Sequence, residues 1–111
     1  MGLNDQKLRF KDHEKLAHYA KEACDVEYLF PMGWGEIYGN HNRTDYDLKR
    51  HQEFSGKSME YLDPETNEKY TPYVIEPSVG CDRLTLAVLC DAYNEETLED
   101  GSIREVMKLS P

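Results

Sequence analysis

The chain has 111 residues, the length of at most one domain. Its net charge of −9 argues against a general nucleic-acid grip, which needs a basic face. No apolar run approaches the roughly 20 residues of a membrane span, so no membrane partner is expected. Three cysteines without a short paired spacing, Cys24, Cys81 and Cys90, fit a reduced cytoplasmic protein.

The first periodic segment follows a polar stretch of eleven residues that we expect to be extended or frayed. Helical spacing begins near Asp12, which can cap the helix, and continues through Leu16, Tyr19, Ala20 and Ala23. The two histidines of this segment, His13 and His18, are five residues apart, whereas a helical zinc pair needs four. We therefore expect no zinc.

Two strands are predicted next, over residues 25–30 and 34–42, with a turn between them at residues 31–33. Alternation places Glu36 on one face with two aromatic side chains, in a strand thinned by glycine. Glycine in a strand often marks the approach of a ligand, but an exposed Glu on an edge strand fits the same spacing. The spacing leaves both interpretations open.

A short helix is predicted to begin at residues 44–47, which resemble a capping box, and to end between Phe54 and Gly56. Four basic residues lie in or just before it: Arg43, Lys49, Arg50 and His51. On sequence alone, a solvated helix face is the favoured interpretation of this cluster.

The second half of the chain is predicted to contain a hairpin, a buried helix, an acidic loop and a last strand. Their ranges are 59–62 paired with 68–75, then 84–93, 94–101 and 102–109. The helix is expected to be buried because it is apolar nearly all round.

Polar residues gather where the strand that ends at Glu76 turns into this helix. Glu76 and Ser78 are two apart, so in extended geometry both can face one ligand, and together they suit a small ammonium group. Gly80 lets a ligand approach the backbone, and Arg83 can stack on a base or pair with a phosphate. The alternative is a plain turn in which Arg83 pairs with Asp82 or Glu76 at the surface.

Three stretches of the chain resemble one enzyme family, in the order in which that family has them. They are His13–Ala20, Gly33–Gly39 followed by Asn42–Leu48, and Glu76–Arg83. The last resembles the third signature motif of class II aminoacyl-tRNA synthetases. Ser78 stands where most class II enzymes have glycine, as in glycyl-tRNA synthetases.

The resemblance implies an α+β fold, an antiparallel sheet flanked by helices. Residues 1–111 would be the C-terminal part of the catalytic domain of a homodimeric parent enzyme, without its anticodon-binding domain. The parent would activate glycine with ATP to glycyl-adenylate and transfer the glycyl group to tRNA(Gly).

The resemblance also implies roles for individual residues. Glycine would be bound by Glu76, Pro77, Ser78, Val79 and Gly80. ATP would be contacted by Glu36, Ile37, Gly80, Cys81, Asp82 and Arg83. Arg83 and Glu36 would be catalytic, and Glu36 would hold Mg²⁺ through ATP.

The first and second class II motifs are not found in this chain, so we expect the 111 residues alone to be inactive. A different possibility is a non-catalytic relative that serves as a binding or dimerisation module. Such a relative should have lost Glu76, Ser78 or Arg83, and all three are present.

Overall fold

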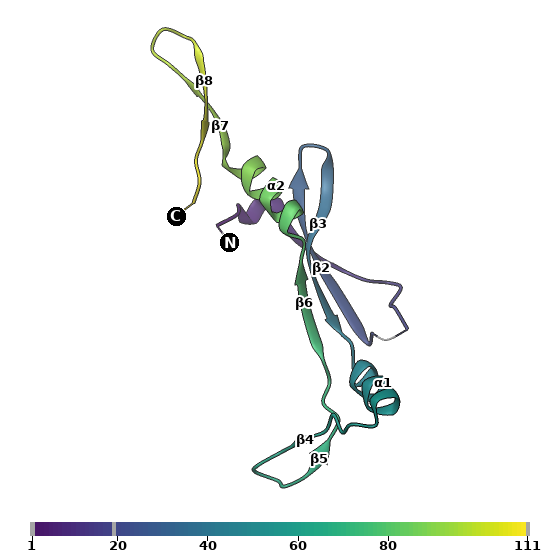
Figure 1. The fold of residues 1–111 in the computed structure, drawn as a ribbon. Coiled ribbons are helices and arrows are strands. Elements are labelled where there is room, and N and C mark those ends of the chain that lie inside the picture. Colours follow the sequence, from purple (N-terminus) through teal and green to yellow (C-terminus); the bar gives the residue numbers. More distant parts are fainter. Residues whose placement is uncertain (1, 19, 111) are drawn as a thin grey trace. The chain divides into compact units, whose positions relative to one another are not determined.

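A computed structural model describes residues 2–18 and 20–110. Its elements in chain order are η1 (Asp5–Lys7), β1 (Leu8–Asp12), β2 (Glu22–Phe30), β3 (Gly33–Asn42), α1 (Tyr46–Ser55), β4 (Tyr61–Leu62), β5 (Lys69–Tyr70), β6 (Ile75–Val79), α2 (Cys81–Ala92), β7 (Tyr93–Thr97) and β8 (Ile103–Met107). Runs of strands are interrupted by α1, which follows β3, and by α2, which follows β6 (Figure 1).

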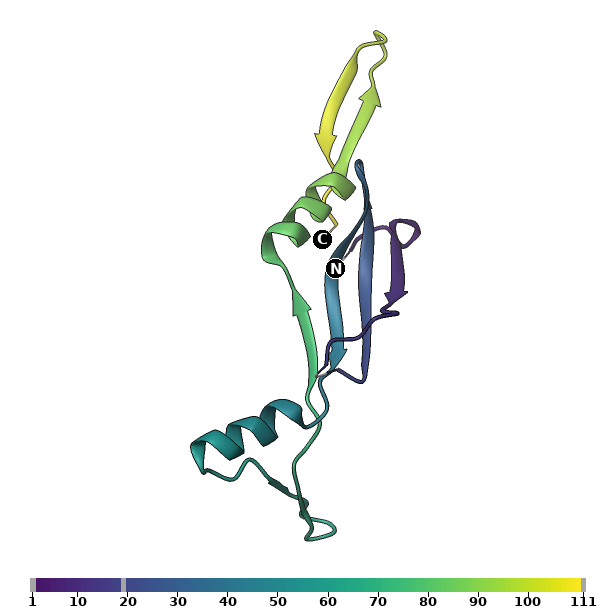
Figure 2. The ribbon, with the colours of Figure 1, turned by 90° about the vertical axis from the view of Figure 1, so that its right-hand side faces the viewer.

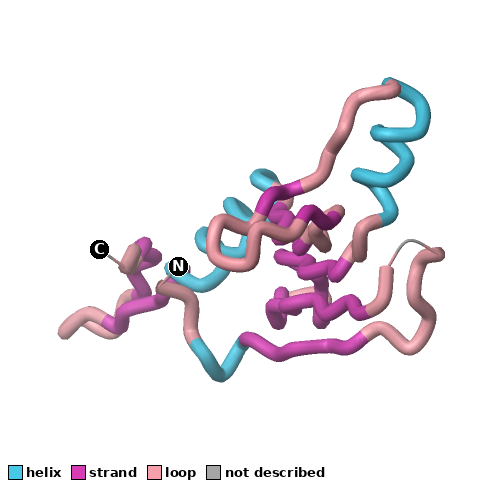
Figure 3. Tube along the Cα trace, turned by 90° about the horizontal axis from the view of Figure 1, so that it is seen from below, coloured by secondary structure: helices cyan, strands magenta, loops and turns pink. Residues whose placement is uncertain are grey.

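One sheet contains four strands in the order β1-β2-β3-β6, and two further pairs, β4–β5 and β7–β8, are antiparallel hairpins. The chain is therefore α+β, as the sequence predicts. Strands dominate the trace over the two helices (Figure 3). No helix of the described residues is long and apolar enough to cross a membrane.

The chain divides into two compact units. The first unit consists of Met1–Lys11, Asp25–Tyr38 and Val79–Pro111, and the second of Asp12–Cys24 and Gly39–Ser78. The first unit holds α2 and the β7–β8 hairpin, and the second holds α1 and the β4–β5 hairpin, which are drawn in Figure 2.

The core of the first unit forms where α2 packs on β2 and β3. It is made of Tyr28, Phe30, Ile37 and Ala87, with the two aromatic rings edge to face at 4.9 Å. The Tyr28 hydroxyl donates a hydrogen bond of 2.9 Å to Asp91 Oδ1 on α2. Strand alternation accounts for this core, because every second residue of β2 and β3 points inward.

The β2–β3 hairpin confirms the predicted strands and turn, and β2 begins three residues earlier than expected. The helix predicted from Asp12 is wrong: the described residues between β1 and β2 are bends, turns and irregular backbone. Two backbone groups of this segment bond to strand residues: His13 N donates to Ala23 O at 3.0 Å, and Lys21 N donates to Asn42 O at 2.8 Å. Sheet pairing therefore overrides the helical spacing. Tyr19, part of that spacing, lies outside the described residues.

The predicted short helix is confirmed as α1, and Gly56 ends it in the left-handed conformation, at φ 68°. The predicted capping box is wrong, because Thr44 has φ 58° and Asp45, the N-cap residue, makes no side-chain cap. Asp47 turns back to Arg43 instead, so its carboxylate is not used for capping.

The predicted strand 68–75 is replaced by β5 and β6, with residues 71–74 irregular between them. Pro72 lacks the N–H that continued pairing needs, which explains the break. Glu76 thus lies near the start of β6, and not at the C-terminal end of a strand as predicted.

The helix after Gly80 is confirmed as α2, with Arg83 in its first turn. Its predicted burial is wrong, because only Ala87 and Ala92 are buried, and Leu86 and Leu89 remain 41% and 48% exposed.

The acidic loop predicted over 94–101 is wrong in its first half, where β7 pairs with β8. Glu96 is stabilised there by Arg104 directly across the pair, at 2.6 Å. The predicted last strand is confirmed as β8. The three cysteines, all among the described residues, are not joined in disulfides.

Candidate functional site

A cavity of about 350 Å³ lies in the first unit, at the start of α2. Six residues line it, from two segments far apart in the sequence: Glu36 and Ile37 on β3, and Gly80, Cys81, Asp82 and Arg83 at the start of α2. The structure thus brings together all six residues predicted to contact ATP.

The first turn of α2 forms one wall of this cavity. Gly80 is the N-cap residue, in extended backbone conformation, and no side chain among the described residues caps the helix. The first helical bond runs from Leu84 N to Gly80 O at 2.9 Å. The backbone N–H groups of the first turn of α2, before Leu84, lie at the positive end of the helix dipole, so this wall favours an anion.

Arg83 links the two walls of the cavity. Its Nη1 donates a hydrogen bond of 2.9 Å to the backbone carbonyl of Glu36. The pairing of Arg83 with Asp82 or Glu76, the alternative from the sequence, is not found, since the guanidinium is held on β3. A guanidinium has five N–H donors, so this one bond leaves others for a planar or anionic ligand.

β3 presents Glu36 and Ile37 to opposite sides. Ile37 is 2% exposed and belongs to the core, whereas the Glu36 side chain faces solvent at the cavity. The buried isoleucine fixes the strand's orientation, and the strand's alternation then places the carboxylate outward.

The residues predicted for glycine lie on β6 and at Gly80. Glu76 is half-buried, and Ser78 and Val79 are exposed. In the second unit, Glu76 Oε2 accepts a hydrogen bond of 2.6 Å from Arg43 Nη1. Glu76 and Ser78 are two apart on one strand, as expected for side chains that share a face.

Arg43 is a residue whose importance the sequence interpretation missed. Its Nε and Nη2 donate to the two oxygens of Asp47, at 2.6 Å and 3.2 Å, while Nη1 holds Glu76. The hydrogen bond from Arg43 lowers the pKa of Asp47, and the two carboxylates raise the pKa of Arg43. The i, i+4 spacing of Arg43 and Asp47 is a signal in the sequence, but the contact with Glu76 spans 33 residues and leaves none.

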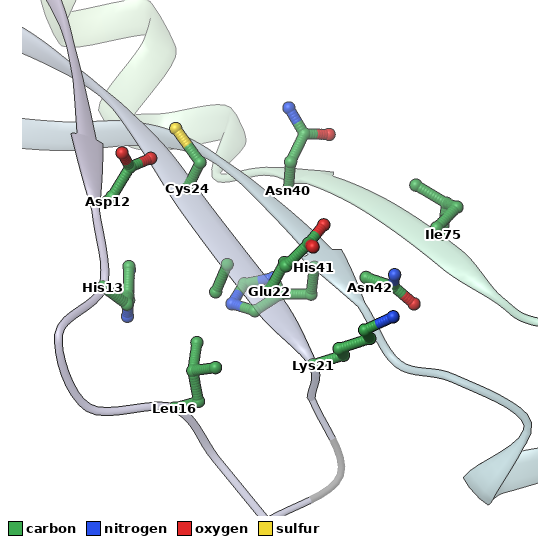
Figure 4. Close-up of a pocket in the computed structure, with 11 residues that line it drawn as sticks. Asp12, His13, Leu16, Lys21, Glu22, Cys24, Asn40, His41, Asn42 and Ile75 are labelled. Carbon is green, nitrogen blue, oxygen red and sulfur yellow. The ribbon is translucent and has the colours of Figure 1, made fainter.

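A cavity of about 530 Å³ in the second unit is larger than the one at the start of α2, and none of the residues predicted for glycine or ATP line it (Figure 4). Its lining includes His13 and His41, whose rings meet edge to face at 6.0 Å. The described residues contain no group of three or more His, Cys, Asp or Glu side chains that could hold a metal ion.

No protein-family model matches the chain. The glycine–tRNA ligase of Geobacillus kaustophilus is 57% identical over 113 residues, which is 100% of this chain and 25% of that protein. The chain belongs to the glycine–tRNA ligase family. The glycine–tRNA ligases of Clostridium acetobutylicum and Bacillus cereus are 58% and 52% identical, each over 100% of this chain and 24% of the relative.

The chain therefore spans about a quarter of the length of the glycine–tRNA ligases it matches. The residues predicted for glycine and for ATP all lie inside this quarter.

Proposed function

We propose that this chain supplies the glycine- and ATP-binding part of a glycine–tRNA ligase. The complete enzyme would join glycine to ATP as glycyl-adenylate, release pyrophosphate, and transfer the glycyl group to tRNA(Gly). The observation that carries the proposal is the cavity in which Arg83 is bonded to Glu36 beside the uncapped start of α2.

This cavity suits a nucleotide triphosphate. The α2 N–H groups and the guanidinium of Arg83 offer donors to phosphate oxygens, and the planar guanidinium also offers a stacking face for adenine. Catalysis at the α-phosphate is chiefly positioning and neutralisation of charge. Arg83 and Glu36 are the catalytic residues of this proposal, with Ile37, Gly80, Cys81 and Asp82 shaping the ATP site.

Glycine offers the enzyme an ammonium group and a carboxylate but no side chain. Glu76 would hold the ammonium by charge and Ser78 by a hydrogen bond, within the stretch that also includes Pro77, Val79 and Gly80.

Magnesium is the metal that this donor set fits. Mg²⁺ is commonly held by one or two carboxylates together with substrate phosphates, and Glu36 and Asp82 both line the cavity. When bound with ATP, Mg²⁺ would neutralise charge on the triphosphate. Glu36 would then hold the ion from β3, while Arg83 serves the phosphates from α2.

The 111 residues would form the C-terminal part of the catalytic domain, and activity would require the rest of the ligase. We further propose that the enzyme is a homodimer. We also propose that it is cytoplasmic, because its three cysteines, all among the described residues, form no disulfide with one another. A non-catalytic module is not favoured, because the matched relatives are ligases by name and Glu76, Ser78 and Arg83 are all retained.

Two substitutions in the full-length ligase test the proposal by glycine-dependent ATP–pyrophosphate exchange. Arg83→Ala should lower kcat/KM for ATP by about 100-fold, because it removes charge stabilisation at the phosphates. Glu76→Gln should raise KM for glycine about tenfold and leave KM for ATP within about twofold, because it removes the charge that faces the ammonium.

Arg104→Ala is the matched control. Arg104 is an exposed arginine in the β7–β8 hairpin, paired with Glu96 at 2.6 Å. Its loss should leave both constants within about twofold, as expected for a surface pair. Unchanged kinetics in Arg83→Ala and Glu76→Gln together would overturn the assignment.

A further inference from the structure

The cavity of about 530 Å³ in the second unit is not lined by any residue assigned above to glycine or ATP. Its lining comes from the end of β1 and the segment after it, the start of β2, the end of β3 and the start of β6. Sites that bind small ligands commonly have volumes of about 300–1,000 Å³. The cavity is therefore large enough to be a ligand site in its own right.

Backbone hydrogen bonds hold the walls of this cavity together. His13 N donates to Ala23 O at 3.0 Å, which ties the segment after β1 to β2, and Lys21 N donates to Asn42 O at 2.8 Å, which ties the residue before β2 to the end of β3. His41 on β3 is half-buried, whereas His13 on the segment after β1 is exposed (Figure 4). The cavity thus has a shielded wall on β3 and an open side through which a ligand can enter.

Two histidine side chains point most directly to a ligand. The rings of His13 and His41 lie edge to face, with their centroids 6.0 Å apart and an angle of 71° between their planes. His41 Nδ1 is buried and has no hydrogen-bond partner among the described residues. Buried polar atoms of folded proteins are nearly always hydrogen-bonded, so this nitrogen indicates a ligand that supplies the partner. A flat heteroaromatic ligand fits, because one imidazole can stack on its face while the other bonds to its edge.

The other polar side chains of the lining indicate a nucleoside. The amide of Asn40 can pair with the edge of an adenine through its oxygen and its nitrogen. The carboxylates of Asp12 and Glu22 can accept hydrogen bonds from ribose hydroxyl groups, and Lys21 can pair with a phosphate. Two carboxylates and one ammonium give a net charge of −1, which disfavours a triphosphate and suits a nucleoside with one phosphate group.

The cavity lies beside the residue proposed to bind glycine. Ile75 lines the cavity and directly precedes Glu76, and Asn42 lines it and directly precedes Arg43, whose guanidinium bonds to Glu76 at 2.6 Å. A substrate bound in the cavity is therefore next to the glycine site within the second unit.

The last step of the proposed reaction needs such a neighbour. An ester bond forms between a ribose hydroxyl at the 3′ end of tRNA and the glycyl carbonyl carbon, the bond from that carbon to AMP breaks, and AMP and the hydroxyl proton leave. The hydroxyl oxygen must approach the glycyl carbon to about 3–3.5 Å before it reacts. The terminal nucleoside of tRNA therefore requires a site close to Glu76.

We propose that this cavity binds the 3′-terminal adenosine of tRNA(Gly), with its base against His13 and His41 and its ribose against Asp12 and Glu22. This inference rests on the proposed function, because a tRNA end needs a site here only if the glycyl group is transferred.

The test measures the affinity of the full-length ligase for two tRNA(Gly) transcripts, one complete and one without the terminal adenosine. The parent should bind the complete tRNA about tenfold more tightly, because the truncated tRNA has no base to stack in the cavity. His41→Ala should reduce this ratio of affinities to about twofold or less. Asn40→Ala should reduce the ratio as well, so the test does not depend on one variant, and thermal unfolding identifies any variant that has lost its fold.

His51→Ala is the matched control, since His51 is an exposed histidine of α1. Its ratio of affinities should stay within about twofold of the parent's. Glycylation of the complete tRNA gives a second readout. In His41→Ala, kcat/KM for tRNA should fall about tenfold, while kcat/KM for ATP in ATP–pyrophosphate exchange should fall much less, because exchange needs no tRNA.

Three results would overturn the inference and leave the proposed function standing. They are equal binding of the two tRNAs by the parent, an unchanged ratio of affinities in folded His41→Ala and Asn40→Ala, and a loss of affinity in His41→Ala that is equal for both tRNAs. Each would stand beside the expected exchange kinetics of Arg83→Ala and Glu76→Gln. Unchanged exchange kinetics in those two variants would instead overturn the proposed function, and this inference with it.

Discussion

Gly80→Ala separates the function of Gly80 from its part in folding. Gly80 has φ −81° and ψ 115°, a conformation that any residue adopts. A Cβ built there meets only the Cβ of Arg83, at 3.8 Å, which is ordinary van der Waals contact. The added methyl group therefore has room in the folded chain, at the edge of the cavity that Gly80 lines.

Gly80→Ala should change the free energy of unfolding little, because its effect on the helix cap and its effect on the unfolded chain oppose each other. Alanine is a poorer N-cap residue than glycine, at a cost of up to about 1 kcal/mol. It also restricts the unfolded chain, which stabilises the fold by about 0.4–1 kcal/mol at a compatible position. The substrate site has no such compensation, and one methyl group in a close-fitting site costs about 1–3 kcal/mol, or roughly 10–200-fold in kcat/KM.

The assay is ATP–pyrophosphate exchange by the full-length ligase, with glycine and ATP varied separately. We expect kcat/KM for at least one substrate to fall at least tenfold, with a melting temperature close to that of the parent. Exchange within twofold of the parent would refute the close approach of a substrate to Gly80. A lost fold would refute the conclusion that the site has room for a methyl group.

Two further predictions concern the folding of the 111-residue chain, measured by urea unfolding. Tyr28→Phe should lower the free energy of unfolding by about 1.5–3 kcal/mol, because it removes the hydrogen bond to the Asp91 carboxylate from a fully buried ring. Tyr73→Phe is the control: its side chain is 57% exposed, so the free energy of unfolding should hardly change. Equal losses in the two variants would contradict the packing of Tyr28. Stability should also fall as the pH drops below about 4. Burial raises the pKa of Asp91, but hydrogen bonds from Tyr28, Asn4 and Lys7 outweigh it and hold this pKa below its usual value, so the unfolded chain takes up the proton first. Asp91→Asn should flatten the pH dependence of stability, and an unchanged slope would contradict this assignment.

The parts of the fold that could be predicted from the sequence are those specified by local pattern. Alternation over β2 and β3 and the apolar run of α2 identify the elements that hold Ile37 and Arg83. The motif residues 76–83 locate the strand–helix junction. The spacing left the setting of Glu36 open, and the structure decides it: Glu36 is exposed because its neighbour Ile37 is buried in the core.

The parts that could not be predicted depend on contacts between distant residues. The helical spacing after Asp12 is genuine in the sequence, but backbone bonds to Ala23 and Asn42 favour an irregular segment between strands. The contact of Arg43 with Glu76 and that of Arg83 with Glu36 span 33 and 47 residues, beyond the reach of any spacing rule. The apolar pattern of α2 predicts that Leu86 and Leu89 are buried, but it does not show which segment would cover them, and both remain exposed.

The most direct test of the central claim is a crystal structure of the full-length ligase with a non-hydrolysable analogue of glycyl-adenylate. We predict that the ammonium nitrogen lies about 3 Å from a carboxylate oxygen of Glu76, and that the adenylate contacts Arg83 in the cavity at the start of α2. An analogue bound with its ammonium on other residues, or with its nucleotide away from Glu36 and Arg83, would contradict the account.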